Sequence, residues 1–238
     1  MKITSLLVLL FLISPVYGQK VATIKTIRKE KEIEKAFAEN AIQELKSGVL
    51  LVRLNFRQRE VDYYKKHGNI PESKRIEKRQ QEINKYIVKA FSDYFDFCPV
   101  YYFKMSDSQH LVNGELDSVT FYNDLLVVDS LFMPKTDQYL MAEYGNIQQD
   151  TSAYLQGTHY DTSKESPKVR TYYGATKNMQ HALIVMDRDF QQIQSPFPYF
   201  ATYRPISLIK NRFGRAARIL HETLEAYYKK VNLKLLSD

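Results

Sequence analysis

Two aspartates separated by one residue, Asp187 and Asp189, are the residues best placed to do chemistry in this sequence. They directly follow the apolar run 182–186, which lacks polar alternation and is therefore typical of a strand covered on both faces. Paired carboxylates at the end of a strand are residues that a metal-dependent hydrolase can use. Aspartate also forms tight turns, so the simpler prediction is a hairpin that turns at residues 187–189.

The run 183–189 resembles the first motif of haloacid-dehalogenase-type phosphotransferases. The resemblance implies that Asp187 would attack phosphorus as the nucleophile, and that Asp189 would be the general acid and base beside a magnesium ion. That family follows its second aspartate with glycine, whereas Phe190 follows here, and its motif normally opens the domain. A metal-dependent phosphatase-like hydrolase is therefore the alternative function, and we favour the hairpin turn over catalysis.

A divalent metal is a further chemical option, because His159 and Asp161 could act together with His181. Nothing in the spacing of these residues enforces ligation. The sequence also lacks the glycine-rich phosphate loop, the serine-hydrolase elbow and the zinc-peptidase helix motif. We therefore expect no metal and no cofactor.

The leading hypothesis is a non-catalytic binding or envelope-associated protein. Basic side chains gather in residues 57–89 and 204–234, and acidic ones gather in residues 106–165. Clusters of lysine and arginine attract anionic surfaces, although the glutamates interspersed in residues 57–89 favour a solvated face there. The expected binding residues are three arginines of the last helix and three tyrosines of the polar stretch 148–179, namely Arg212, Arg215, Arg218, Tyr160, Tyr172 and Tyr173.

The first 18 residues have the pattern of a signal peptide: a lysine, a short apolar run and a small residue, Gly18, before the expected cleavage site. This pattern predicts export to a periplasm or secretion, with no transmembrane segment after cleavage. We expect the partner to be another envelope protein or an anionic envelope surface, and not a nucleic acid. The only cysteine, Cys98, cannot form an internal disulfide and is expected to be a buried, inert thiol.

The elements that must position these residues are predicted from apolar spacing. Helical spacing indicates helices over residues 28–46, 57–67, 72–95 and 206–231. Apolar runs indicate strands over residues 49–55, 97–105 and 181–186, with two or three more among the runs 119–122, 125–128 and 139–144. In the first helix, the expected buried face carries Ile33, Phe37, Ile42 and Leu45, and Gly48 suits a left-handed cap after it. Residues 19–238 are therefore expected to form a single α/β domain with a mixed sheet covered by helices on both faces.

Two resemblances concern the whole chain. The order helix, strand, helix, strand, followed by a late hairpin and a closing helix, resembles a thioredoxin fold without its cysteines and with an insertion, which implies an adaptor as a third possible function. The segments 97–101 and 196–199, together with a signal peptide cut before Gln19, resemble exported α/β proteins of Bacteroidetes-type bacteria that have no assigned activity. That resemblance implies a compartment and no activity.

Overall fold

The computed structural model describes residues 24–128, 132–147, 153–156, 168–171, 180–204 and 209–236. Its helices are α1 (Ile24–Ser47), α2 (Gln58–Lys66), α3 (Ile70–Tyr94), α4 (Ser108–Val112) and α5 (Ile209–Leu235), with short 3-10 turns at Met105–Asp107 and Leu116–Ser118. Its strands are β1 (Val49–Leu54), β2 (Val100–Lys104), β3 (Phe121–Tyr122), β4 (Tyr139–Asn146), β5 (Ala153–Gln156), β6 (Lys168–Thr171), β7 (His181–Met186) and β8 (Phe200–Thr202).

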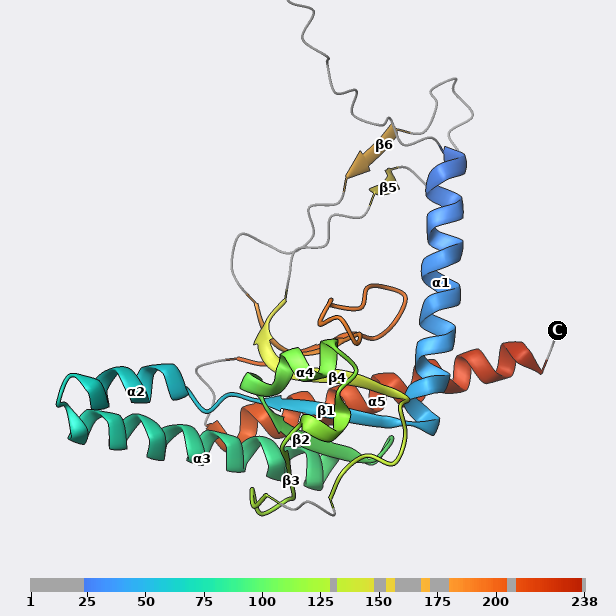
Figure 1. Ribbon diagram of the computed structural model, residues 1–238. Coiled ribbons are helices and arrows are strands. Elements are labelled where there is room, and N and C mark those ends of the chain that lie inside the picture. Colours follow the sequence, from blue (N-terminus) through green and yellow to red (C-terminus); the bar gives the residue numbers. More distant parts are fainter. Residues whose placement is uncertain are drawn as a thin grey trace, which may run out of the picture.

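Six of these strands form one mixed sheet in the order β3-β2-β1-β4-β7-β8 (Figure 1). β1 pairs in parallel with both β2 and β4, whereas the pairs β2–β3, β4–β7 and β7–β8 are antiparallel. β5 and β6 form a separate antiparallel pair. Because β1 has a neighbour on each side, every one of its residues except Arg53 is buried, which explains its nearly continuous apolar sequence.

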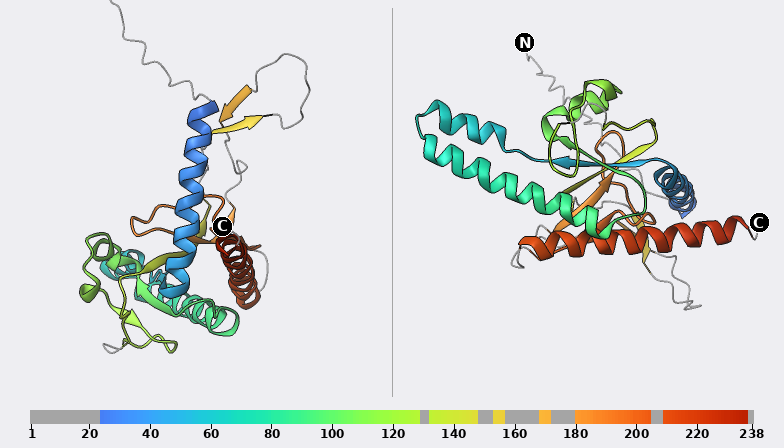
Figure 2. Two further views of the ribbon diagram at one scale, coloured as in Figure 1. Left: turned by 90° about the vertical axis from the view of Figure 1, so that its right-hand side faces the viewer. Right: turned by 90° about the horizontal axis from the view of Figure 1, so that it is seen from below.

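The two faces of the sheet are covered unequally. The long helices α1, α3 and α5 pack on one face, where α3 and α5 lie side by side (Figure 2). The other face is covered by α4, the 3-10 turn Leu116–Ser118 and connecting loops. The prediction of an α/β fold with a mixed sheet is therefore confirmed, with most of the helical mass on one side.

The apolar run before the two aspartates forms β7, as expected. Its residues Ala182 to Met186 are buried, and it lies between β4 and β8 and not at the edge of the sheet. Because β7 is antiparallel to β4, its carboxyl end lies beside the amino ends of β1 and β4. Asp187 therefore lies at the opposite edge of the sheet from the carboxyl ends of the parallel strands.

The helix α3 packs on the sheet with its carboxyl-terminal part and forms a projecting hairpin with α2 at its amino-terminal part. Its first turn is capped by Asn69, whose side chain accepts the backbone N–H of Glu72 at 3.2 Å, and Pro71 occupies a position where a first turn tolerates it. Its buried stripe includes Ile87 and Phe91 but also two polar side chains, Gln80 and Asn84. The α2–α3 hairpin extends away from the sheet in Figure 1.

Two of the three apolar runs in the middle of the chain form strands, β3 and β4, which agrees with the two or three strands expected there. The third run does not form a strand. The run 125–128 contributes a single bridge, from Val128 to Tyr122, and Leu126 adopts a positive φ of 58° that turns the chain. Leu125 is 79% exposed, so this run is a solvated turn. A run of four apolar residues cannot by itself distinguish a strand from a turn, and here Asn123 and Asp124 supply the turn chemistry.

Candidate ligand-binding cavity

A cavity of about 240 Å³ lies at the edge of the sheet where the parallel strands β1, β2 and β4 end. Open α/β sheets commonly bind ligands beyond the carboxyl ends of their strands, at the point where the chain switches direction across the sheet. Strand ends, α3 and the start of α5 supply the lining, which consists of Arg53, Asn55, Gln80, Ile83, Asn84, Ile87, Met105, Glu143, Tyr144, Tyr203, Arg212 and Phe213. We call this space the carboxyl-edge cavity.

An ion pair between β1 and β4 forms one wall of the cavity. The Nε atom of Arg53 donates to an Oε atom of Glu143 at 2.7 Å, and a second guanidinium nitrogen contacts the same oxygen. The two side chains are 18% and 21% exposed. The guanidinium also lies 4.8 Å from the ring centre of Phe190, so a cation–π contact is added to the ion pair.

A chain of amide side chains from α3 forms a second wall. Gln80 donates to the Oδ1 atom of Asn84 at 3.1 Å, and Asn84 donates to the backbone carbonyl of Asn55 at 3.0 Å. Asn84 is fully buried. Because each amide is held by the next, their remaining polar atoms have fixed directions, which lowers the entropic cost of binding a ligand.

The start of α5 adds a cation and an aromatic wall. The guanidinium of Arg212 lies 4.7 Å from the ring centre of Phe213 and 5.8 Å from that of Tyr203. Burial raises the pKa of the Tyr203 hydroxyl, although the nearby guanidinium of Arg212 opposes this effect. Tyr144 donates its hydroxyl to the carbonyl of Phe213 at 2.9 Å, which ties β4 to α5, and burial raises the pKa of Tyr144 well above its usual value.

This arrangement favours binding of a small anion. Two guanidinium groups and one carboxylate line the cavity, so its formal charge is positive. The planar guanidinium group suits carboxylates and phosphates, which it can bind with two parallel hydrogen bonds. The volume lies below the usual range for drug-sized ligands, which indicates a ligand of metabolite size.

The three arginines expected to bind together do not form one surface. Arg212 is half-buried and lines the cavity, whereas Arg215 is exposed. Arg218 is also exposed and lies 3.9 Å from Glu222. Successive steps of three residues rotate the side chain by about 60° around the helix axis, so Arg212 and Arg218 point in clearly different directions.

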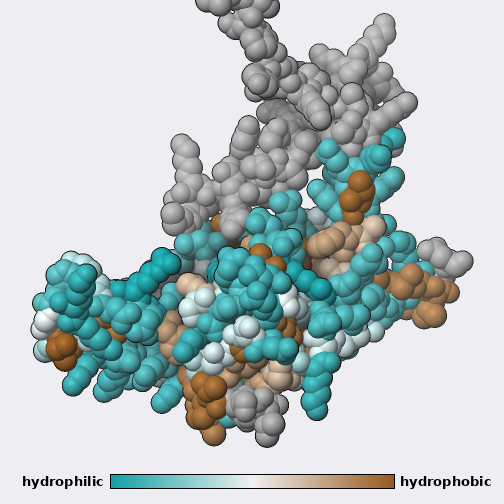
Figure 3. Space-filling view, viewed as in Figure 1, coloured by the Kyte–Doolittle hydropathy of each residue, from teal (hydrophilic) through white to brown (hydrophobic). Residues whose placement is uncertain are grey.

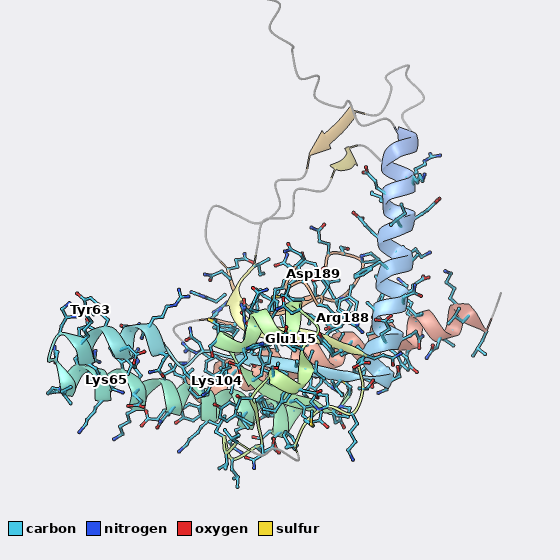
Figure 4. All side chains as sticks on the ribbon, viewed as in Figure 1. Tyr63, Lys65, Lys104, Glu115, Arg188 and Asp189 are labelled. Atoms are coloured by element: carbon cyan, nitrogen blue, oxygen red, sulfur yellow. The ribbon has the colours of Figure 1, made fainter. Side chains whose placement is uncertain are left out.

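The two aspartates lie in a hairpin turn, outside this cavity. The Asp187 carboxylate accepts the backbone N–H groups of Asp189 and Gln191 at 3.0 Å and 2.9 Å, and Asp189 is exposed. Arg188 donates to the carbonyl of Asp137 and lies over the ring of Tyr139, and Figure 4 shows Arg188 and Asp189 far from the end of the α2–α3 hairpin. Hydrolysis by Asp187 and Asp189 therefore stays a prediction, and the geometry of the turn adds nothing to it.

The remaining candidate residues are only partly described. Tyr160, Tyr172, Tyr173, His159 and Asp161 lie outside the described residues. His181 is half-buried and stacks on Tyr203 with ring centres 5.9 Å apart. Within the part of the chain that the structure describes, no group of three histidine, cysteine or acidic side chains could hold a metal ion.

The expectation for Cys98 is confirmed in its burial. Its side chain is 7% exposed, and burial raises the pKa of the thiol to about 12. The thiol is therefore protonated at neutral pH, and a protonated thiol is a poor nucleophile.

Three residues of the cavity could have been recognised from the sequence, because they are polar residues that interrupt apolar patterns. Arg53 is the one charged residue in an otherwise apolar strand, and Gln80 and Asn84 interrupt the apolar stripe of α3. Buried charged and amide side chains need partners, so such interruptions point to a polar site or an internal network. Glu143 and Tyr203 carry no comparable local signal.

Comparisons with known proteins found no similarity: no protein-family profile matches the chain, and neither a curated protein nor a solved structure is detectably similar to it. The thioredoxin-like topology and the likeness to exported Bacteroidetes-type proteins therefore stay predictions. Among the described helices, none combines the length and the apolar character needed to cross a membrane.

Proposed function

We propose that this chain is an exported, non-catalytic binding protein whose ligand is a small molecule with a carboxylate or phosphate group, held in the carboxyl-edge cavity. The observation that carries the proposal is the position of Arg212, a half-buried cation beside the fixed amides of Gln80 and Asn84. The anionic group would bind the guanidinium and the amide N–H groups, and its apolar part would contact Ile83 and Phe213.

The chemistry of the lining supports binding over catalysis. The described side chains around the cavity include no histidine, cysteine, serine or lysine, and their only carboxylate, that of Glu143, is paired with Arg53. The pKa values of Tyr144 and Tyr203 are raised by burial, so neither hydroxyl can act as a base at neutral pH. These groups can orient a ligand through hydrogen bonds.

The signal-peptide pattern supports a periplasmic or secreted location, in which the partner of the protein is another envelope protein or an anionic envelope surface. The formal net charge is +7 for the full sequence and becomes +6 when the expected signal peptide is removed with Lys2, which supports attraction to such a surface. Arg215 and Arg218 remain exposed on α5 for a contact of this kind.

Thermal unfolding of the purified protein with a panel of small anions tests the cavity. The panel contains succinate, glutamate, citrate, inorganic phosphate and glycerol 3-phosphate, with succinamide and glycerol as neutral counterparts. At about a hundred times its Kd, a bound anion is expected to stabilise the protein by about 2.7 kcal/mol, which raises the Tm by roughly 5–10 °C. The neutral counterparts are expected to leave the Tm unchanged.

The matched variants are Arg212→Gln and Arg215→Gln, which remove the same charge from neighbouring turns of α5. Arg212→Gln is expected to weaken binding about ten- to a hundredfold, because a charge-assisted hydrogen bond is lost. Arg215→Gln is expected to bind as the wild type does. Equal losses in the two variants, or a shift caused equally by neutral counterparts, would count against the cavity as the site.

A further inference from the structure

The outer end of the α2–α3 hairpin exposes apolar side chains on a convex, basic surface. Tyr63 and Ile70 are 57% and 44% exposed there. Figure 3 shows an apolar spot at this end of the hairpin among hydrophilic atoms, and Figure 4 places Tyr63 and Lys65 there. We call Tyr63, Lys65, Lys66 and Ile70 the hairpin tip.

The hairpin tip has an ordered conformation. Gly68 takes the positive φ of 75° that the reversal of the chain requires, and Asn69 caps the first turn of α3. The rings of Tyr63 and His67 lie 4.2 Å apart. A rigid arrangement of this kind presents its side chains to a partner with little loss of conformational entropy.

The charges of the tip have one sign. Residues 63–71 include Lys65 and Lys66 and no acidic residue. The nearest acidic residues are engaged with their own helices: Asp62 accepts a hydrogen bond from Gln58, and Glu72 forms an ion pair with Arg75. The tip is therefore a local positive end on a hairpin whose remaining charges are largely balanced.

The shape of the tip discriminates between partners. A stable protein interface buries about 800 Å² on each side, and a convex two-helix end offers much less. A nucleic acid would bind the lysines but would gain nothing from an exposed isoleucine. The surface of an anionic bilayer accommodates both features, because tyrosine and the aliphatic side chain enter the headgroup region while lysines remain at the phosphates.

We propose that the hairpin tip docks on an anionic phospholipid bilayer, with Tyr63 and Ile70 inserted among the headgroups and Lys65 and Lys66 at the lipid phosphates. This proposal rests on the proposed function in one respect only, namely that the protein is exported and meets the cell envelope. The tip is separated from the carboxyl-edge cavity by about 15 Å along α3, from Ile70 to Gln80, so the two sites can act independently.

Co-sedimentation of the exported, purified protein with vesicles tests this surface. The vesicles contain phosphatidylcholine alone or phosphatidylcholine with about a third of phosphatidylglycerol, a proportion chosen to give a clearly negative surface. The wild type is expected to bind the anionic vesicles at least tenfold more tightly, and the binding is expected to weaken as salt is raised from 0.1 to 0.5 M. Replacing Lys65→Gln and Lys66→Gln together is expected to weaken it by roughly 25-fold, about fivefold for each lysine.

The matched control replaces Lys85→Gln and Lys89→Gln, two exposed lysines of α3, the other helix of the hairpin, at positions closer to the sheet. This control is expected to bind within about threefold of the wild type, whereas Ile70→Ser is expected to weaken binding by roughly three- to tenfold. Equal binding to neutral vesicles, an equal loss in the control, or tight binding to a DNA oligonucleotide that Ile70→Ser leaves unchanged would each overturn the proposal. The tip variants are expected to keep the thermal shift with small anions, so failure at the tip and failure at the cavity can be told apart.

Discussion

Replacing Gly48 by alanine is expected to lower the free energy of unfolding by about 3 kcal/mol or more. A β-carbon at this position would lie 2.1 Å from the carbonyl oxygen of Gln138 and 2.7 Å from that of Glu44. Both neighbours are backbone atoms, so the steric clash can be removed only if β1 moves away from the segment that leads into β4. The hydrogen bond from Val49 to Gln138, at 3.0 Å, would be lost first. Chemical denaturation followed by circular dichroism measures the change.

Gly68→Ala is the matched control for this substitution. Gly68 has a positive φ of 75°, and a β-carbon there would meet nothing within 4 Å. Its cost is therefore the backbone strain of a left-handed alanine, about 1–2 kcal/mol. If Gly48→Ala destabilised the protein no more than Gly68→Ala does, the close approach of β1 to the β4 segment would be wrong.

The substitution Arg53→Met is expected to lower the free energy of unfolding by about 2–3 kcal/mol, because it leaves the Glu143 carboxylate half-buried without its partner. This is less than a fully buried pair would cost, since the Glu143 side chain is 21% exposed. The double variant Arg53→Met with Glu143→Leu is expected to lie within about 1 kcal/mol of the wild type, because no unpaired charge remains. Urea titration of the two single variants and the double variant measures this coupling.

A double variant as unstable as Arg53→Met would show that the arginine stabilises the sheet through contacts other than this ion pair. The stacking of Arg53 on Phe190 is the alternative contact that the structure offers. In that case Phe190→Leu is expected to lower the free energy of unfolding by a similar amount, which would assign the effect of Arg53 to its contact with the aromatic ring.

Elements with a continuous apolar pattern could be predicted from the sequence. The helix expected at residues 72–95 is α3, and the strand expected at 49–55 is β1. The buried apolar side chains of α3 face one packed layer, and those of β1 face a packed layer on each side of the sheet, so their sequence patterns are regular. Gly48 was interpreted as a left-handed cap, and this is wrong because its φ is not positive. The true constraint, contact with a carbonyl 90 residues away, has no local signature.

The helix α1 shows how packing limits a periodic pattern. Ile42 and Leu45 are fully buried, as their spacing predicts, but Ile33 and Phe37 on the same stripe are 59% and 49% exposed. The reason is that the amino-terminal half of α1 extends beyond the sheet, as Figure 1 shows. A stripe predicts which side of a helix is apolar, but not how far the layer beneath it continues.

The carboxyl-edge cavity could be predicted only in part. Arg53, Gln80 and Asn84 stand out as polar residues at buried positions, so a polar site near the end of β1 was accessible to sequence reasoning. The strand order that brings Glu143 beside Arg53 depends on contacts between distant parts of the chain. The contact of Arg212 with Tyr203 joins the start of α5 to the residue that follows β8. The paired aspartates attracted the chemical interpretation because their signal is local, and they lie at the other edge of the sheet.

The most direct test of the cavity is a crystal structure of the protein with the panel anion that raises the Tm most. The expected result is the anionic group of that ligand within hydrogen-bond distance of the Arg212 guanidinium and of an amide of Gln80 or Asn84, between β4 and α3. A ligand bound at the turn that holds Asp187 and Asp189, with the carboxyl-edge cavity filled only by water, would contradict the account.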